Sequence, residues 1–312
     1  MKNLVNNNAD IAVYRKPSLM KKFKEDYAFG YLMIAPTIIG LIILNLWPMI
    51  QTLYLSFNKT GGFGDNKWVG LENYKTMLTD SAVIHATINT LKYTIVSVPI
   101  GIILSLIIAV LLNANIKGKT IYRTIYFLPM VSAPAAIAMV WRILYNGDYG
   151  FFNLILSKIG IYGVKWLTDP KIALFCIIVV GIWSTLGYNM IILLAGLQEI
   201  PTTLYEAAEI DGAGPIRKFF TITLPLISPT MFFVVVTTMI GSLQVFDLIL
   251  MMIDRTNAAM ESTQSLVYLF YQNSFVMNNK GYGSAIIMLL LAMILIITVI
   301  QLKLQKKWVH YQ

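Results

Sequence analysis

The sequence predicts an all-α, polytopic membrane protein with six transmembrane helices. Of its 312 residues, 57% are hydrophobic and only 12% are charged, whereas an ordinary soluble domain has about 25% charged residues. Apolar runs of about 20 residues or more recur, which is the length that crosses ~30 Å of hydrocarbon. These runs are too long and too continuously apolar for barrel strands. Helices are expected because a chain in lipid must satisfy its own backbone groups.

The six spans follow one another with short connections. Prolines at positions 99, 129 and 134 should kink the second and third spans. No connection outside the membrane is long enough for a folded domain. The expected spans are residues 31–57, 88–112, 121–145, 172–197, 226–253 and 282–302.

Lysine and arginine placement sets the expected orientation. With the N-terminus inside, the inner segments hold 14 of the 24 basic residues, in keeping with the positive-inside rule. This topology explains the net charge of +9 better than nucleic-acid binding does, because the basic residues form no single patch. We divide the chain into a basic cytoplasmic tail (1–27), a transmembrane domain (28–305) and a C-terminal cytoplasmic tail (306–312).

Several chemistries are unsupported by the sequence. Cys176 is the only cysteine, and His85 and His310 lack metal-ligand spacing. The run Gly118-Lys119-Thr120 resembles the end of a phosphate-binding loop, but Asn113 stands where that loop requires glycine. No catalytic constellation appears. We therefore expect no enzyme activity, no metal and no cofactor on this chain.

The polar stretch at residues 198–229 separates the fourth and fifth spans. Pro201 can open a helix, because proline at the first helical position loses no needed N–H. Asp211-Gly212 is a typical helix end, and Pro215 can open a second short helix. The stretch therefore predicts a polar helix–turn–helix between two membrane spans.

Fixed positions in this stretch carry a family resemblance. Glu206-Ala207-Ala208, Gly212 and Ile222-x-Leu224-Pro225 reproduce the EAA-x3-G-x9-I-x-L-P signature of ABC importer permeases. The resemblance implies a type I ABC importer permease fold, in which residues 198–225 form the cytoplasmic coupling helix and seat in a cleft of an ATPase subunit. The alternative is an amphipathic interfacial helix that only joins two spans. The implied ATPase-coupling residues are Tyr205, Glu206, Ala207, Ala208, Asp211, Gly212, Pro215 and Phe219.

Further stretches resemble the carbohydrate-uptake branch of this family. They are VGLENY at 69–74, LPMV at 128–131 and LAGLQEIP at 194–201. The likeness to the maltose-type permease extends over about residues 28 to 305. It implies that the fourth and fifth spans contact the sugar. The implied substrate-path residues are Gly181, Thr185, Tyr188, Thr238, Ser242, Gln244 and Val245.

Asp247 is added to this list because it is a charged residue within a predicted span. A charge at the bilayer centre costs roughly 2.5–3.5 kcal/mol on insertion scales, so an intramembrane carboxylate needs a role. One role is on the translocation path, and the alternative is that Asp247 caps or pairs with a neighbouring helix. For the other residues of the path the alternative is interhelical packing, since small and polar side chains also let helices approach closely.

Together these observations predict the permease subunit of a binding-protein-dependent ABC importer in a bacterial cytoplasmic membrane, with both termini inside. It would carry a sugar, an oligosaccharide or disaccharide, by alternating access. The implied partners are a second related permease, two ATPase subunits that bind ATP and Mg, and an extracytoplasmic sugar-binding protein. The alternative is a self-contained secondary transporter or channel, for which Asp247 alone supplies no continuous ion relay.

Overall fold

The computed structural model describes residues 19–60, 66–114 and 116–309. Positions 1–18 and 310–312, which hold most of the predicted N-terminal tail and the end of the predicted C-terminal tail, lie outside the described residues. The chain divides into two compact units, residues 1–52 and residues 53–312.

The first unit contains the first predicted span. It consists of α1 (Leu19–Leu41), the π-helical turn η1 (Ile42–Leu46) and the start of α2 (Trp47–Ser56). Phe29–Ser56 is long and apolar enough to cross a membrane. Pro36 lies inside α1, and such prolines are tolerated in membrane helices because local adjustments satisfy the freed backbone groups.

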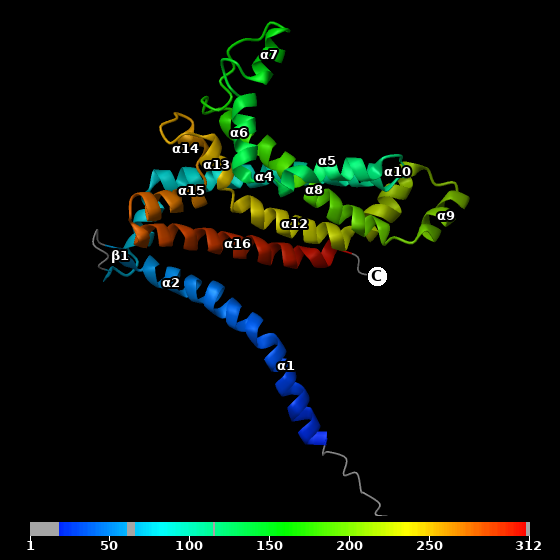
Figure 1. The fold of residues 1–312 in the computed structure, drawn as a ribbon, viewed down its shortest axis with the longest axis horizontal. Coiled ribbons are helices and arrows are strands. Elements are labelled where there is room, and N and C mark those ends of the chain that lie inside the picture. The colour runs from blue at the N-terminus through cyan, green and yellow to red at the C-terminus, as the bar shows by residue number, and fades with distance from the viewer. Residues whose placement is uncertain (1–18, 61–65, 115, 310–312) are drawn as a thin grey trace, which may run out of the picture. The chain divides into compact units, whose positions relative to one another are not determined.

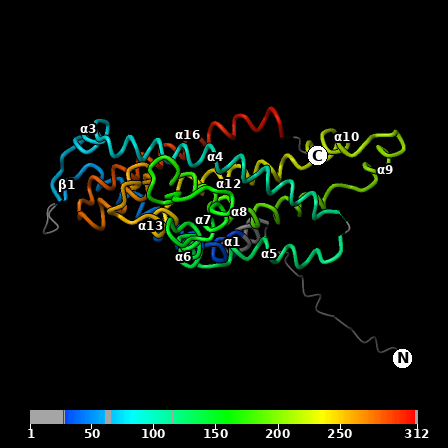
Figure 2. The backbone as a smooth tube through the Cα atoms, turned by 90° about the horizontal axis from the view of Figure 1, so that it is seen from above, coloured from blue at the N-terminus to red at the C-terminus, as the bar shows by residue number. Residues whose placement is uncertain are grey.

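The second unit is a helical bundle built on α4, α8, α12 and α16, which run along one another (Figures 1 and 2). In this bundle α4 packs on α8 and α12, and α12 also packs on α16. The bounds of these four helices are Ser81–Asn113 for α4, Ala173–Gln198 for α8, Ser228–Leu243 for α12 and Lys280–Trp308 for α16.

Shorter elements connect the bundle helices. One end carries a two-stranded antiparallel hairpin with Asn58 opposite Trp68, and the other end carries α9 and α10 (Figure 1). The bounds are β1 (Asn58–Thr60), β2 (Asn66–Trp68), α3 (Glu72–Thr79), α5 (Lys119–Val131), α6 (Pro134–Leu144), α7 (Phe151–Ser157), α9 (Thr202–Ile210), α10 (Pro215–Lys218), η2 (Phe219–Thr223), α11 (Leu224–Leu226), α13 (Asp247–Met252), α14 (Met260–Thr263), α15 (Leu266–Tyr271) and η3 (Gln272–Val276).

Two of the predicted spans are bent rather than continuous. The described residues contain four single helices able to cross a membrane, or six spans when two bent pairs are included. The third predicted span breaks between α5 and α6, which meet at 100°. The cause is Pro134 at the start of α6, because the residue before a proline is held extended, and Ala133 has φ −61° and ψ 132°.

The fifth predicted span is interrupted twice. The segment Pro215–Leu226 meets α12 at 67°. At its other end α12 stops at Leu243, and α13 begins only at Asp247. The expectation of one continuous helix over residues 226–253 is therefore wrong, and the second interruption places Asp247 at a helix start instead of mid-helix.

Close backbone approach holds α5 against α8. A Cβ at Gly187 would lie 1.9 Å from the carbonyl oxygen of Tyr126, so only glycine fits there. On the neighbouring face of α8, the Ser105 hydroxyl of α4 donates to the Leu186 carbonyl at 3.1 Å. Small and hydroxylated residues at such contacts are typical of helix packing in membranes.

We predict that Gly187→Ala destabilises the bundle by about 1–3 kcal/mol, the usual cost of overpacking a filled core. The measurement is the midpoint of thermal unfolding in detergent. Gly241→Ala is the matched control, because a Cβ at Gly241 meets nothing within 4 Å. Equal midpoints for the two variants would contradict the close contact between α5 and α8.

Candidate functional site

The signature loop, residues 198–225, is a rigid turn rather than a flexible connection. Its helix α9 ends at Ile210, and Gly212 follows the C-cap Asp211 with φ +75°. The Gly212 N–H donates to the Glu209 carbonyl at 3.0 Å, and the Ala213 N–H donates to the Ala208 carbonyl at 2.8 Å. These two bonds form a Schellman motif, which needs a left-handed residue at the Gly212 position.

Two side-chain contacts brace the loop from within. The Lys218 ammonium donates to Glu209 Oε1 at 2.6 Å. The hydroxyls of Tyr205 and Thr223 lie 2.9 Å apart in a hydrogen bond. Thr223 closes the π-helical turn η2, and π turns within α-helices occur frequently at functional sites. These contacts join α9 to the residues that lead into α12.

The predicted coupling residues fall into two groups. Glu206, Ala207, Asp211, Gly212 and Pro215 are exposed, and Tyr205, Ala208 and Phe219 are partly buried. Tyr205 packs against the core cluster at this end of the bundle. Its hydroxyl therefore bonds within the loop, whereas its ring packs against the bundle.

Sequence reasoning missed the loop's exposed apolar side chains. Ile210 is 88% exposed and Ile216 is 76% exposed, and Phe220 is also exposed. They flank the glycine turn. These side chains could have been predicted from the sequence, because an isoleucine stands on each side of the polar Asp-Gly turn, where a solvated loop would carry polar residues.

A central cavity of about 360 Å³ lies among α4, α5, α6, α8, α12 and α13. It brings together all eight substrate-path residues expected from the sequence, although they come from three helices and one helix break. They are Gly181, Thr185, Tyr188, Thr238, Ser242, Gln244, Val245 and Asp247.

Tyr93 forms one wall of the cavity. A Cβ at Gly181 would lie 1.9 Å from the Tyr93 hydroxyl oxygen. The tyrosine hydroxyl therefore occupies the space that a side chain at position 181 would need. Ser97 follows one turn later on the same helix and also lines the cavity. Helix α4 therefore contributes a wall that the sequence-based list lacks.

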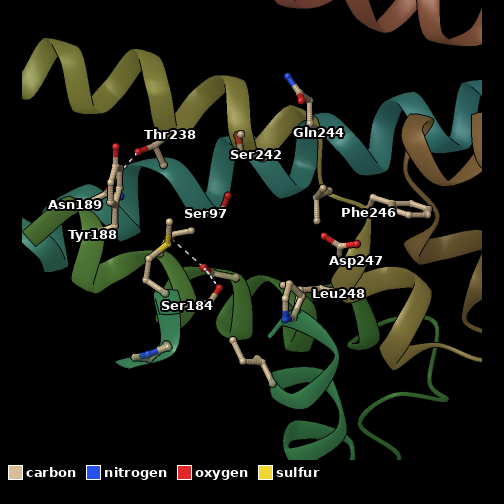
Figure 3. A pocket seen from close by; sticks show the side chains of 18 of the residues that line it. Ser97, Ser184, Tyr188, Asn189, Thr238, Ser242, Gln244, Phe246, Asp247 and Leu248 are labelled. Carbon is tan, nitrogen blue, oxygen red and sulfur yellow. Dashed lines mark hydrogen bonds between the residues drawn. The ribbon is translucent and has the colours of Figure 1, made fainter. Parts of the chain in front are cut away.

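The amide of Asn189 lies on the opposite wall, with Tyr188 beside it (Figure 3). Its Oδ1 accepts a hydrogen bond from Thr238 at 3.2 Å. Its Nδ2 is buried and has no partner among the described residues, and the same holds for the Ser97 hydroxyl. Each such buried, unsatisfied group costs about 1–3 kcal/mol.

Asp247 opens α13 at the edge of the cavity (Figure 3). A carboxylate in the first turn of a helix is stabilised by the unpaired N–H groups there. Gln244 precedes it in the helix break, and its amide points away from Asp247 in Figure 3. Phe246 and Leu248, which flank Asp247 in the sequence, also line the cavity.

A further part of the lining comes from the bend between α5 and α6. Pro129, Met130, Ser132, Pro134 and Ile137 all face the cavity. Sequence reasoning identified the two prolines as kinks but did not connect them to the substrate path. Ser132-Ala-Pro134 was the available signal, because a polar residue before a proline-induced break marks backbone that must line a cavity in a membrane protein.

Metal binding finds no support in the described part of the chain, where no group of three or more His, Cys, Asp or Glu residues could hold an ion.

Comparisons with known proteins agree with this geometry. Residues 98–310 match the family described as "Binding-protein-dependent transport system inner membrane component". The chain is 34% identical to the probable ABC transporter permease protein YesP of Bacillus subtilis, over 94% of this chain and 95% of that one. It is 35% identical to the trehalose/maltose transport system permease protein MalF of Thermococcus litoralis, over 92% and 97%.

Among solved structures, a bacterial alginate ABC transporter in complex with an alginate pentasaccharide-bound periplasmic protein contains a similar chain. The TM-score is 0.82 at 25% sequence identity, and the match covers 93% of this chain and 97% of that one. The signature loop, the polytopic helical fold and these matches agree, and the chain belongs to the family of binding-protein-dependent transport system inner membrane components, as a non-catalytic permease subunit of an ABC transporter.

Proposed function

We propose that this permease carries a neutral sugar, a disaccharide or short oligosaccharide, into the cytoplasm by alternating access. Separate ATPase subunits, which bind ATP and Mg, drive the cycle. A second related permease completes the path, and an extracytoplasmic solute-binding protein delivers the sugar. The signature loop faces the cytoplasm, as do both termini.

The chemistry of the central cavity supports a sugar as the cargo. Hydroxyl and amide groups face it from Ser184, Tyr188 and Asn189. The aromatic residues Tyr93 and Phe246 also line the cavity and add apolar surface beside these polar groups. The volume of about 360 Å³ lies within the roughly 300–1,000 Å³ of small-molecule sites.

The charge of the cavity supports a neutral sugar in particular. Its described lining contains one carboxylate, Asp247, and no lysine, arginine or histidine. An anionic cargo would meet an unbalanced negative charge in a low-dielectric site, which is strongly unfavourable. Relatives of this chain are named for trehalose and maltose, and others for sn-glycerol-3-phosphate. The charge of the cavity fits the neutral sugars trehalose and maltose better than it fits the anion sn-glycerol-3-phosphate.

The single observation that carries the coupling mechanism is the braced signature loop. It leads directly from α8 and into α12, which are two walls of the cavity. A force on its exposed apolar side chains is therefore transmitted to the cavity walls without an intervening flexible segment. Apolar side chains exposed on a short turn suit a cleft in a partner protein.

We predict that Gly212→Pro abolishes ATP-driven uptake while the affinity for the solute-binding protein stays intact. Proline fixes φ near −65° and removes the N–H that bonds to Glu209, so the turn cannot form. The measurement is sugar uptake by the complete complex in liposomes, with binding-protein affinity measured in parallel.

Gly212→Asn is the control, since asparagine is among the residues that tolerate the left-handed region. Uptake should persist in this variant at a reduced rate. Undiminished uptake by the Gly212→Pro complex would refute the coupling role of the loop.

We also predict that Asn189→Leu lowers sugar uptake by about tenfold or more, because a site that hydrogen-bonds a substrate hydroxyl loses discrimination and rate without that bond. Thermal stability should fall by no more than about 1–2 kcal/mol, because the substitution removes the unpartnered Nδ2 together with the single hydrogen bond that Oδ1 accepts from Thr238.

Thr87→Val on α4 is the matched control. The Thr87 hydroxyl donates to the Val83 carbonyl of its own helix at 2.7 Å, and Thr87 does not line the central cavity. Its uptake should match that of the unaltered complex. Normal uptake by the Asn189→Leu complex would remove Asn189 from the substrate path.

A further inference from the structure

A second cavity lies at the end of the bundle opposite the signature loop. It measures about 300 Å³ and is formed by β1, α3, η3 and the first residues of α4 and α16. We name it the Asp80 pocket. Its lining includes Glu72, Asn73, Thr76, Asp80, Asn273 and Tyr282. This polar lining contrasts with the apolar helices below it.

Three side chains of this lining already use their hydrogen-bond donors within the chain. The Asn73 Nδ2 donates to the carbonyl oxygens of Ser56 and Asn58 at 2.8 and 2.9 Å. The Asn273 Nδ2 donates to the Leu269 carbonyl at 2.9 Å. The Tyr282 hydroxyl donates to Asp80 Oδ2 at 2.6 Å.

The two asparagines among these side chains therefore offer acceptors to a ligand. Because each amide uses its NH₂ group on backbone carbonyls, the amide orientation is set and Oδ1 is left over. Neither the Oδ1 of Asn73 nor that of Asn273 receives a hydrogen bond from a described residue. Asn273 is only 9% exposed, so its free acceptor is held in a nearly buried wall.

The pocket is also negatively charged. Glu72 and Asp80 contribute two carboxylates, and Lys59 is the single cation of the described lining. Two negative charges and one positive charge give a formal charge of −1. Among the described ion pairs none joins Lys59 to either carboxylate. This negative site stands out on a chain with a net charge of +9.

A ligand that matches this lining must donate several hydrogen bonds and carry positive charge. Guanidinium and ammonium groups are donors only, with five and three N–H groups, and they pair with carboxylates and amide oxygens. A sugar hydroxyl would bring acceptors as well as donors, and an anion would be repelled. The chemistry thus selects an arginine or lysine side chain.

We propose that the Asp80 pocket receives an arginine or lysine side chain of the solute-binding protein when that protein docks. The proposal rests on the proposed function, because the topology proposed there places this end of the bundle on the extracytoplasmic side of the membrane, where the solute-binding protein docks. A volume of about 300 Å³ admits a single long side chain. The similar alginate transporter was solved with its periplasmic protein bound.

The test uses the complete transporter in lipid nanodiscs and the solute-binding protein that supports its sugar uptake. The double variant Glu72→Gln with Asp80→Asn removes both charges and keeps the fold. Asparagine is as good an N-cap as aspartate, so it can replace the Asp80 Oδ1 that accepts from the Ala82 N–H at 2.9 Å. Glu72→Gln alone is a second variant that leaves the cap untouched.

The dissociation constant of the binding protein should rise about tenfold in the double variant, and its dependence on salt should become weaker. Glu261→Gln is the matched control, because Glu261 is an exposed carboxylate on α14 outside the pocket. It should leave the dissociation constant unchanged. An equal loss in the control would indicate general attraction and overturn the pocket's role.

Two further outcomes would also overturn it. One is an unchanged dissociation constant in both pocket variants. The other is thermal stabilisation of the transporter by Ca²⁺ that only the double variant loses, which would assign the pocket to a metal cation. If the unaltered transporter neither binds the protein nor hydrolyses ATP in response to it, the proposed function fails instead.

Discussion

Backbone polar groups cannot be left unpaired in lipid, and this constraint organises the second unit. Its long helices satisfy their own groups, so irregular backbone is tolerated only where it is buried in protein or lines a polar space. The break at residues 132–133 and the break at 244–246 both open onto the central cavity. At the second break Ser265 donates to the Val245 carbonyl at 2.6 Å, which satisfies a freed acceptor.

These breaks also explain why one cavity gathers residues from so many elements. A straight third span would run past the cavity, but the 100° bend turns Ser132 and Pro134 toward it. A straight fifth span would place Asp247 in the middle of a helix. The interruption instead gives its carboxylate the N-terminus of α13, where the helix dipole lowers the cost of a charge. Polarity inside the bundle is therefore concentrated where the helices stop.

The sequence predicted the local features well, because they depend on neighbouring residues. The Gly212 turn follows from residue types and spacing, and the polar residues of the fourth and fifth spans follow from the family resemblance. Tyr93 and Ser97 were not predicted to line the cavity, because their position there depends on how α4 packs against Gly181, which is far away in the sequence. The sharp bend at Pro134 was not predicted for a similar reason. A proline alone predicts a kink, but the surrounding helices determine the bend angle.

Helix α4 is the element that the two cavities share. Asp80 caps its N-terminus and lines the Asp80 pocket, and Tyr93 and Ser97 on the same helix line the central cavity. Thirteen residues separate Asp80 from Tyr93, which at 1.5 Å per residue is about 20 Å of helix. Pro99 lies inside α4, but the stretch from Ser81 to Ser97 precedes it and is a continuous helix. A partner that contacts the Asp80 pocket thus acts on the first turn of a helix whose later turns form a cavity wall.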